Sequence, residues 1–504
     1  MKHSSATALA PLAGGLDEEQ DELKGNLGVA AIVMIVVAGA APLGVIASSM
    51  PIMLLLTETY ILPVYYVLAG AFFILFSVGF VAVSKFVPRA AAFYTYIQAG
   101  LGRVPGVASA ILTVCSYVVM VASIHVYSGL LISNLVQSYT DLDSPWWAWS
   151  LLQVAIIGSI GFRNIDLGVK VLFILVGIEI AFILIMNVFT LVQGGAQGLS
   201  ARPFHATLIH GDTLGIGVMF AAIGFFGFEA ITVFRGESKD PERTVPRATY
   251  TALVGVAIFY IFTSWVVVMG TGPDGAIAAA LADPEFVIIH QAATFVGAVF
   301  GDLLQVLIIT SLFACALAFH NVTARCQFNL GKSGVAPKWL GKAHPVLGSP
   351  SRSSLVVSVT CLALIAIPLF TGVDPYLDFY VWMSGAGALG IIALMALTSV
   401  SIVMFFARTK LDTRVWNSRI APTLTALALL ALLVLVVINF PLLVSGKTAA
   451  LVIGFAMLGL FGAGLVYGMV LKLKRPEAYA HLGTFAAAHD AGDEQQTAGK
   501  KVLR

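Results

Sequence analysis

Two segments rich in glycine and proline interrupt long apolar runs of this 504-residue chain, and both could bind a small charged molecule. The first is Gly39-Ala-Ala-Pro-Leu-Gly44, in which Pro42 lacks an N–H group and clashes with the preceding helical turn. The second is Gly224-Phe-Phe-Gly-Phe-Glu229. Free N–H groups at a broken helix favour a carboxylate, and free carbonyl groups favour an ammonium. Glycine and proline also serve packing and kinking in membrane helices. Either segment alone is therefore explained equally well by a binding site and by a simple kink.

A buried acid is the next candidate for chemistry. Glu179 has apolar neighbours on both sides, and ionisable groups at bilayer depth are costly and often functional. Because burial favours the neutral form of a carboxyl group, Glu179 could bind and release a coupling proton. A structural hydrogen bond to the first break is an equally good interpretation. Ser311 is a candidate to face Glu179, and His125 could line the substrate path, although a packing role is more common for such a histidine. We expect Glu229 to hold the second break by accepting hydrogen bonds.

The elements that must position these residues are membrane helices. Hydrophobic residues make up 59% of the chain and charged residues 11%, against about 25% charged residues in soluble domains. The apolar runs approach or exceed the ~20 residues that cross a bilayer, and they do not alternate as barrel strands would. We predict an all-α integral membrane protein with twelve spans at about 27–50, 60–84, 104–137, 146–162, 168–192, 213–234, 247–270, 298–324, 353–371, 376–407, 418–440 and 449–472.

The distribution of positive charge predicts how these spans are oriented. With the N-terminus in the cytoplasm, 26 of the 28 Lys and Arg residues fall on the cytoplasmic side, and only Arg202 and Lys447 on the other. Positive charge normally concentrates in cytoplasmic loops. We therefore expect a multi-pass protein of the cytoplasmic (inner) membrane, with cytoplasmic disordered tails at 1–26 and 475–504. The charged cluster at 237–247 is expected to be a solvated loop with weak ion pairs at an inner gate.

The two broken spans are the first and the sixth, so they lie five spans apart. Paired interrupted segments at matching positions of two inverted repeats point to a binding site near the bilayer midplane. We predict one repeat of five helices at 27–192, a second at 213–407, and a final pair of helices at 418–474. The pairing favours a central site over two unrelated kinks, and its N–H and carbonyl groups suit a zwitterion such as an amino acid.

Three stretches resemble the amino acid–polyamine–organocation superfamily of permeases. The more specific are GFFGFEAITVFRGESKDPERTVPRATY at 224–250 and HNVTARCQFNLGKSGVAPKWLGKAHPVLGSP at 320–350, and GFRNIDLGVKVLFILVGIE at 161–179 is similar to the family's entry into its fifth span. The resemblance covers about 27–475. It implies a leucine-transporter-like fold that works by alternating access, with the substrate held between the breaks of spans one and six.

The resemblance also implies which residues bind the substrate. Backbone groups of the first break would meet the carboxylate, carbonyl groups around Ile223 and Phe226 would meet the amine, and phenylalanines of the second break would form a gate or pocket wall. Many members have Gly-x-Gly in the first break, where this chain reads Ala-Ala-Pro-Leu-Gly. The implied substrate-binding residues are Ala40, Ala41, Pro42, Leu43, Gly44, Ile223, Gly224, Phe225, Phe226, Gly227 and Phe228.

These patterns predict a secondary transporter of an amino acid or related amine, coupled to protons or working by exchange. The alternative is a secondary transporter of another substrate class, such as an inorganic cation, a nucleobase or an organic acid, on this or another twelve-helix fold. The sequence shows no Ser/His/Asp, Cys/His or metal-ligand set, so we predict neither an enzyme nor a bound metal or cofactor. It also shows no basic stripe with interleaved aromatic residues that would predict nucleic-acid binding.

Overall fold

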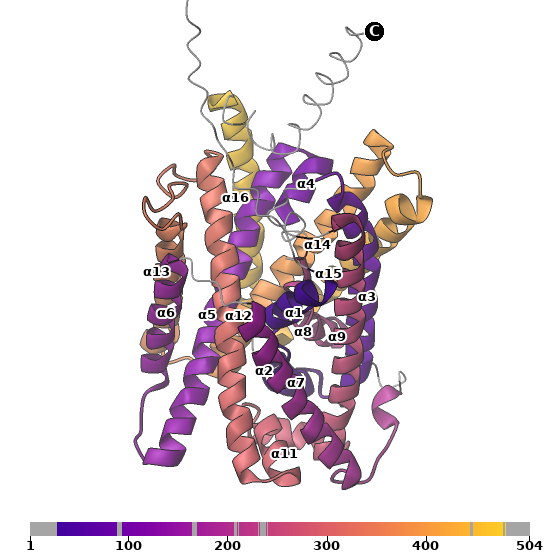
Figure 1. Ribbon diagram of the computed structural model, residues 1–504, viewed down its shortest axis with the longest axis vertical. Coiled ribbons are helices and arrows are strands. Elements are labelled where there is room, and N and C mark those ends of the chain that lie inside the picture. The colour runs from indigo at the N-terminus through magenta and orange to yellow at the C-terminus, as the bar shows by residue number, and fades with distance from the viewer. Residues whose placement is uncertain are drawn as a thin grey trace, which may run out of the picture.

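The computed structural model describes residues 28–87, 93–163, 169–205, 209, 211–229, 231, 238, 240–443, 447–476 and 479. Every element that these residues form is a helix (Figure 1). Ten candidate spans in this part of the chain are long and apolar enough to cross a membrane, and two shorter apolar helices accompany them. The prediction of a helical membrane protein is therefore confirmed.

The helix bounds fall close to most of the predicted spans. A short 3₁₀-helix spans Arg202–Phe204, and π-helical turns at Pro375–Tyr380 and Trp416–Ile420 lead into two of the long helices. In chain order the α-helices are α1 Val29–Ala40, α2 Pro42–Thr57, α3 Leu62–Ser84, α4 Phe93–Leu101, α5 Arg103–Thr140, α6 Trp146–Phe162, α7 Val169–Val192, α8 Leu214–Ile223, α9 Pro241–Thr271, α10 Ala276–Ala282, α11 Val287–Phe295, α12 Ala298–Lys332, α13 Ser351–Thr371, α14 Val381–Thr409, α15 Ala421–Leu443 and α16 Lys447–Lys474.

The long helix α5 connects the two ends of the molecule. It has 38 residues, and at ~1.5 Å per residue it is about 57 Å long. Because the hydrocarbon core of a bilayer is only ~30 Å thick, α5 must tilt and extend beyond it. Figure 1 shows α5 inclined across the bundle, from the end of the molecule that holds α11 to the end that holds α4.

The prediction was wrong at the start of α9. The charged cluster at 237–247 was expected to be a loop, but α9 begins at Pro241, so that three of the charged residues lie in its first two turns. Proline at the first helical position and an acid in the first turn are signals of a helix start. Glu242 forms an ion pair with Lys85 at the end of α3, with 2.5 Å between Nζ and Oε2. Residues 232–237 and 239 lie outside the described residues. The helices α4, α10 and α11 were not predicted either.

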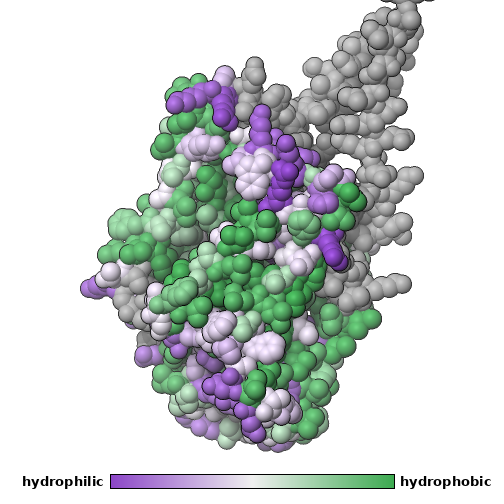
Figure 2. Space-filling model, turned by 90° about the vertical axis from the view of Figure 1, so that its left-hand side faces the viewer, coloured by the Kyte–Doolittle hydropathy of each residue, from purple (hydrophilic) through white to green (hydrophobic). Residues whose placement is uncertain are grey.

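The outer faces of the helix bundle are apolar. In Figure 2 hydrophobic residues form a broad zone across the middle of the visible face, and hydrophilic residues gather toward its two ends. Exposed large apolar side chains on α7, α13, α15 and α16 include Phe173, Phe370, Ile438 and Phe455. Soluble monomers rarely expose apolar patches this continuous, so these faces are suited to contact with lipid tails.

The helices next to the two breaks, α1, α2 and α8, lie in the centre of the bundle. Every residue of α8 from Gly215 to Ile223 is buried, and so is most of α2. Helix α8 packs against α2, α3, α14 and α15, while α1 packs against α7, α9 and α12. A helix that is apolar on all sides is normally surrounded by other helices. The fold therefore buries the interrupted backbone, where neighbouring helices can satisfy its polar groups.

Candidate functional site

The first break is a single residue between two helices. Helix α1 ends at Ala40 and α2 begins at Pro42, and Ala41 between them adopts a left-handed conformation with φ 44° and ψ 66°. This conformation is uncommon for a residue with a Cβ atom. Ala41 is 2% exposed, and its N–H group donates to the Ala38 carbonyl at 3.2 Å. Proline at the next position explains the break, because it cannot continue the helix hydrogen bonds of α1.

The break leaves polar backbone groups without partners in their own helices, at the centre of the molecule. Pro42 has no N–H group, and the N–H groups of Leu43 and Gly44 lie in the first turn of α2, where a helix offers them no acceptor. The helix dipole adds partial positive charge at the same place. On the other side of the break, the Gly39 carbonyl lies 3.6 Å from the Cys315 sulfur of α12. The start of α2 is therefore suited to an anionic group.

The second break follows α8 and lies against the first. The chain turns from Gly224 to Gly227, with the Phe226 N–H group donating to the Ile223 carbonyl at 3.1 Å. Gly227 has φ 96°, a conformation that side chains other than glycine rarely adopt. A Cβ atom on Gly227 would lie 3.4 Å from the Gly39 carbonyl carbon and 3.7 Å from the Ala40 nitrogen. The two breaks that the sequence singled out are therefore in contact in the fold.

Glu229 accepts hydrogen bonds from the second break and from α5. Its Oε2 atom accepts the Gly227 N–H group at 3.0 Å, and its Oε1 atom accepts the Tyr117 hydroxyl of α5 at 2.7 Å. The carboxylate thus ties the second break to α5.

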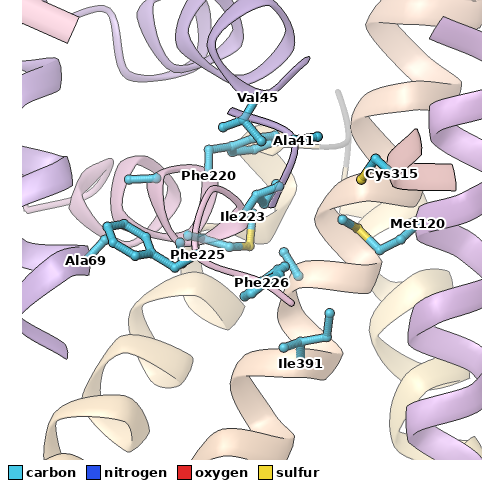
Figure 3. Close-up of a cluster of buried hydrophobic side chains, with 14 of the residues drawn as sticks. Ala41, Val45, Ala69, Met120, Phe220, Ile223, Phe225, Phe226, Cys315 and Ile391 are labelled. Atoms are coloured by element: carbon cyan, nitrogen blue, oxygen red, sulfur yellow. The ribbon is translucent and has the colours of Figure 1, made fainter. Parts of the chain in front are cut away.

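A small cavity lies between the two breaks. Its volume is about 30 Å³, which is enough to hold at least one water molecule. Figure 3 shows Ala41 and Val45 on one side of it, with Ile223, Phe226, Met120 and Cys315 around it. The lining residues are Gly39, Ala40, Ala41, Gly44, Val45, Ser48, Met120, Ser123, Ile124, Ile223, Phe226, Leu312, Cys315, Phe319, Tyr380 and Ser384.

Aromatic side chains close the cavity at both ends. Toward α11, the rings of Tyr127, Tyr376 and Tyr380 lie with centroids 5.2–5.3 Å apart, and the Tyr127 hydroxyl reaches the Glu285 carbonyl between α10 and α11. On the opposite side, Phe226 and Phe319 line the cavity, and the Phe319 ring lies 5.5 Å from that of Tyr117. Aromatic side chains therefore lie at or next to the cavity toward both ends of the bundle.

Helix α12 connects the buried acid to the first break. The Ser311 hydroxyl donates to Oε2 of Glu179 at 2.8 Å, and Glu179 is 3% exposed. One helical turn further along α12, Cys315 contacts the Gly39 carbonyl. Residues four apart lie on the same helix face. A change at Glu179 could therefore reach the first break through this face of α12.

Several expected residues lie outside the cavity lining. His125 contacts Oε1 of Gln153 at 2.7 Å and joins α5 to α6. The rings of Phe225 and Phe228 pack on Phe73 of α3, at centroid distances of 4.9 and 5.3 Å. Pro42, Leu43, Gly224 and Gly227 belong to the breaks but do not line the cavity either.

Sequence reasoning missed the wall opposite the breaks. Met120 and Ser123 come from α5 and Ser384 from α14, which are regular there, and Tyr380 ends the π-helical turn that leads into α14. No local signal marks such positions. Among the described residues, no group of three or more His, Cys, Asp or Glu residues could hold a metal ion.

Comparison with known proteins places this chain in a family. A family model of amino acid permeases matches residues 31–473. Similar proteins include the low-affinity putrescine importer PlaP of Escherichia coli, which is 27% identical over 294 residues (56% of this chain, 61% of the importer). The lysine-specific permease LysP of Lactococcus lactis is 22% identical over 341 residues (61% and 63%). The matched segments thus span about three fifths of the length of these relatives.

A solved structure agrees with the fold. A mutant of the manganese transporter of Eremococcus coleocola has a TM-score of 0.51 and 14% identity, with 95% of this chain and 98% of that chain covered. At this identity the likeness concerns the fold alone. The family model covers most of this chain, including both breaks, and therefore decides its relationship: the chain belongs to the amino acid permease family, whose members are membrane transporters and not enzymes.

Proposed function

We propose that this protein is a secondary active transporter that moves an amino acid or related amine across the cytoplasmic membrane by alternating access. The observation that carries the proposal is the contact between the two helix breaks, because residues of both breaks line one cavity. The names of the relatives, a putrescine importer and a lysine permease, support the same class of substrate.

In this proposal the two breaks recognise the two charges of an amino acid. The substrate carboxylate meets the N–H group of Gly44 at the start of α2, and the ammonium meets the carbonyl groups of Ile223 and Phe226; all three residues line the cavity. Backbone groups held rigidly in a dry site bind charge without reorganisation. Glu229 keeps the second break in position and does not touch the substrate.

In this proposal the protein has twelve membrane spans, arranged as two inverted repeats of five helices followed by a final pair. The ten candidate spans and the shorter apolar helices α6 and α8 support this number, with the bent pair of α10 and α11 assigned to a connection that does not cross the membrane. Both termini then lie in the cytoplasm, because the lysine- and arginine-rich loops do. The cavity with its two aromatic closures is suited to an occluded state, from which the layer toward α11 and the layer at Phe319 open in turn. Glu179 is the proposed carrier of the coupling proton.

Uptake into proteoliposomes tests this proposal. The purified protein is reconstituted and offered labelled amino acids and linear amines, with and without an inward proton gradient. We expect accumulation or exchange of at least one amino acid, and stabilisation of the purified protein by the same compound, because a ligand stabilises the state that it binds. If no compound of the panel were taken up, exchanged or bound, the proposal would be wrong.

The substitution Glu229→Ala tests the role of the brace. It leaves the Tyr117 hydroxyl and the Gly227 N–H group without their acceptor, and a buried polar group without a partner costs ~1–3 kcal/mol. We expect a lower melting temperature of the purified protein and a loss of uptake. The substitution Tyr117→Phe removes the other partner of the same hydrogen bond. Its matched control is Tyr467→Phe, because the Tyr467 hydroxyl donates to the Val335 carbonyl, away from the breaks. Normal uptake by Glu229→Ala would contradict the brace.

A further inference from the structure

We propose that the cavity selects amino acids with small, uncharged side chains, and that Met120 sets the limit on side-chain size. This inference rests on the proposed function, in which the breaks bind the carboxylate and ammonium groups. It adds the kind of side chain that the amino acid carries, because this side chain must face the wall formed by α5, α12 and α14.

The wall opposite the breaks carries no charge. Among the described residues that line the cavity there is no Asp, Glu, Lys, Arg or His. The two buried acids nearby are engaged elsewhere: Glu229 accepts from Tyr117 and Gly227, and Glu179 accepts from Ser311. A second ammonium group, as in lysine or putrescine, would be buried here without an anion. Burying an unpaired charge is strongly unfavourable, so this cavity disfavours dications.

The polar atoms of the wall also suit a small neutral side chain. The Ser123 hydroxyl donates to the Met120 carbonyl at 2.8 Å, and the Ser384 hydroxyl donates to the Tyr380 carbonyl at 2.7 Å. Both hydrogens are therefore used within their own helices, and only oxygen lone pairs remain for a ligand. Apart from the Tyr380 hydroxyl, the other side chains of the wall consist of carbon and sulfur atoms. Such a surface accommodates a hydrogen, a methyl group or a hydroxymethyl group.

The size limit follows from the packing of Met120. A Cβ atom on Gly387 of α14 would lie 2.4 Å from Met120 Cγ, so the methionine side chain fills the space that this glycine leaves open. The cavity itself is small, at about 30 Å³. Methionine is flexible and can yield to a small ligand. A large side chain, however, would need the volume that Met120 itself occupies.

Competition in proteoliposomes tests the charge of the substrate. Uptake of labelled L-alanine and L-serine by the wild-type protein is measured against unlabelled alanine, lysine and putrescine. We expect lysine and putrescine to need concentrations at least about 100-fold higher than alanine for the same inhibition, because their second ammonium finds no anion. Labelled lysine is offered in parallel. If lysine or putrescine were taken up as well as alanine, the inference would be overturned while the proposed function stood; if nothing were taken up, the proposed function would fail first.

A pair of methionine substitutions tests the size limit. Met120→Ala opens the wall, whereas Met186→Ala removes the same atoms from a buried position of α7 outside the cavity. For the wild-type protein we expect leucine to compete about 10-fold or more weakly than alanine, and for Met120→Ala we expect this difference to disappear, in line with the discrimination that a few methylene groups allow. Met186→Ala should behave like the wild type. Equal competition by leucine and alanine in the wild type, or an unchanged difference in Met120→Ala, would refute the role of Met120.

Discussion

Gly227→Ala should lose at least about nine tenths of substrate uptake, because the backbone at this position can hardly accept a Cβ atom. Gly227 has φ 96° and lies against Gly39 and Ala40 of the first break. Holding an alanine in this conformation costs ~1–3 kcal/mol, and every 1.4 kcal/mol changes an equilibrium about tenfold. The chain can avoid the cost by changing this backbone angle, which would alter the turn of the second break where it meets the first. The measurement is uptake per folded protein in proteoliposomes, with the melting temperature as the check on folding.

Two further substitutions make this prediction specific to the break. Gly255→Ala in α9 adds the same methyl group where nothing lies within 4 Å, and it should transport like the wild type. Ala41→Gly should also retain uptake, because glycine adopts the left-handed conformation of Ala41 without strain. If Gly227→Ala transported as well as Gly255→Ala, the fixed geometry of the second break would not matter for transport.

The breaks could be predicted from sequence because their cause is local. Pro42 stops the hydrogen bonds of one helix and begins the next, and glycine at 227 permits a backbone angle that other residues avoid. The contact between these two segments depends on the tertiary fold. The sequence predicted it only indirectly, because the two interrupted spans were expected to lie five spans apart. The contact between Gly227 and Gly39 agrees with that spacing.

The rest of the cavity could not be predicted, because it is made by side chains of uninterrupted helices. Met120, Ser123 and Ser384 stand in runs of apolar and small residues that look alike along their length. Only the way α5 and α14 pack around α8 decides which of these residues face the breaks. The short helices α10 and α11 were missed for a related reason. They are 7 and 9 residues long and lie at 116° to each other. Because each helix is so short, its hydrophobic pattern does not distinguish it from a loop.

The proposed coupling proton leads to the prediction with the other large effect. Glu179→Gln keeps the shape of the side chain and its ability to accept from Ser311, but it removes the site that binds and releases a proton. We therefore expect it to abolish accumulation driven by a proton gradient, while exchange of labelled for unlabelled substrate continues. Exchange needs only the movement of the occupied protein, and the occupied cavity does not include Glu179. Both rates are measured on the same proteoliposomes.

The result separates the two interpretations of Glu179. Its hydrogen bond to Ser311 lies one helical turn from the contact between Cys315 and Gly39, so a purely structural glutamate would act by supporting the first break. In that case Glu179→Gln, which preserves the hydrogen bond, would accumulate substrate like the wild type, and Ser311→Ala, which breaks it, would impair accumulation and exchange together. If Glu179 carries the proton, the order is reversed: the glutamine variant loses gradient-driven accumulation alone, and the serine variant keeps it. Full accumulation by Glu179→Gln under a proton gradient would therefore end the coupling hypothesis and leave Glu179 as a support of the break.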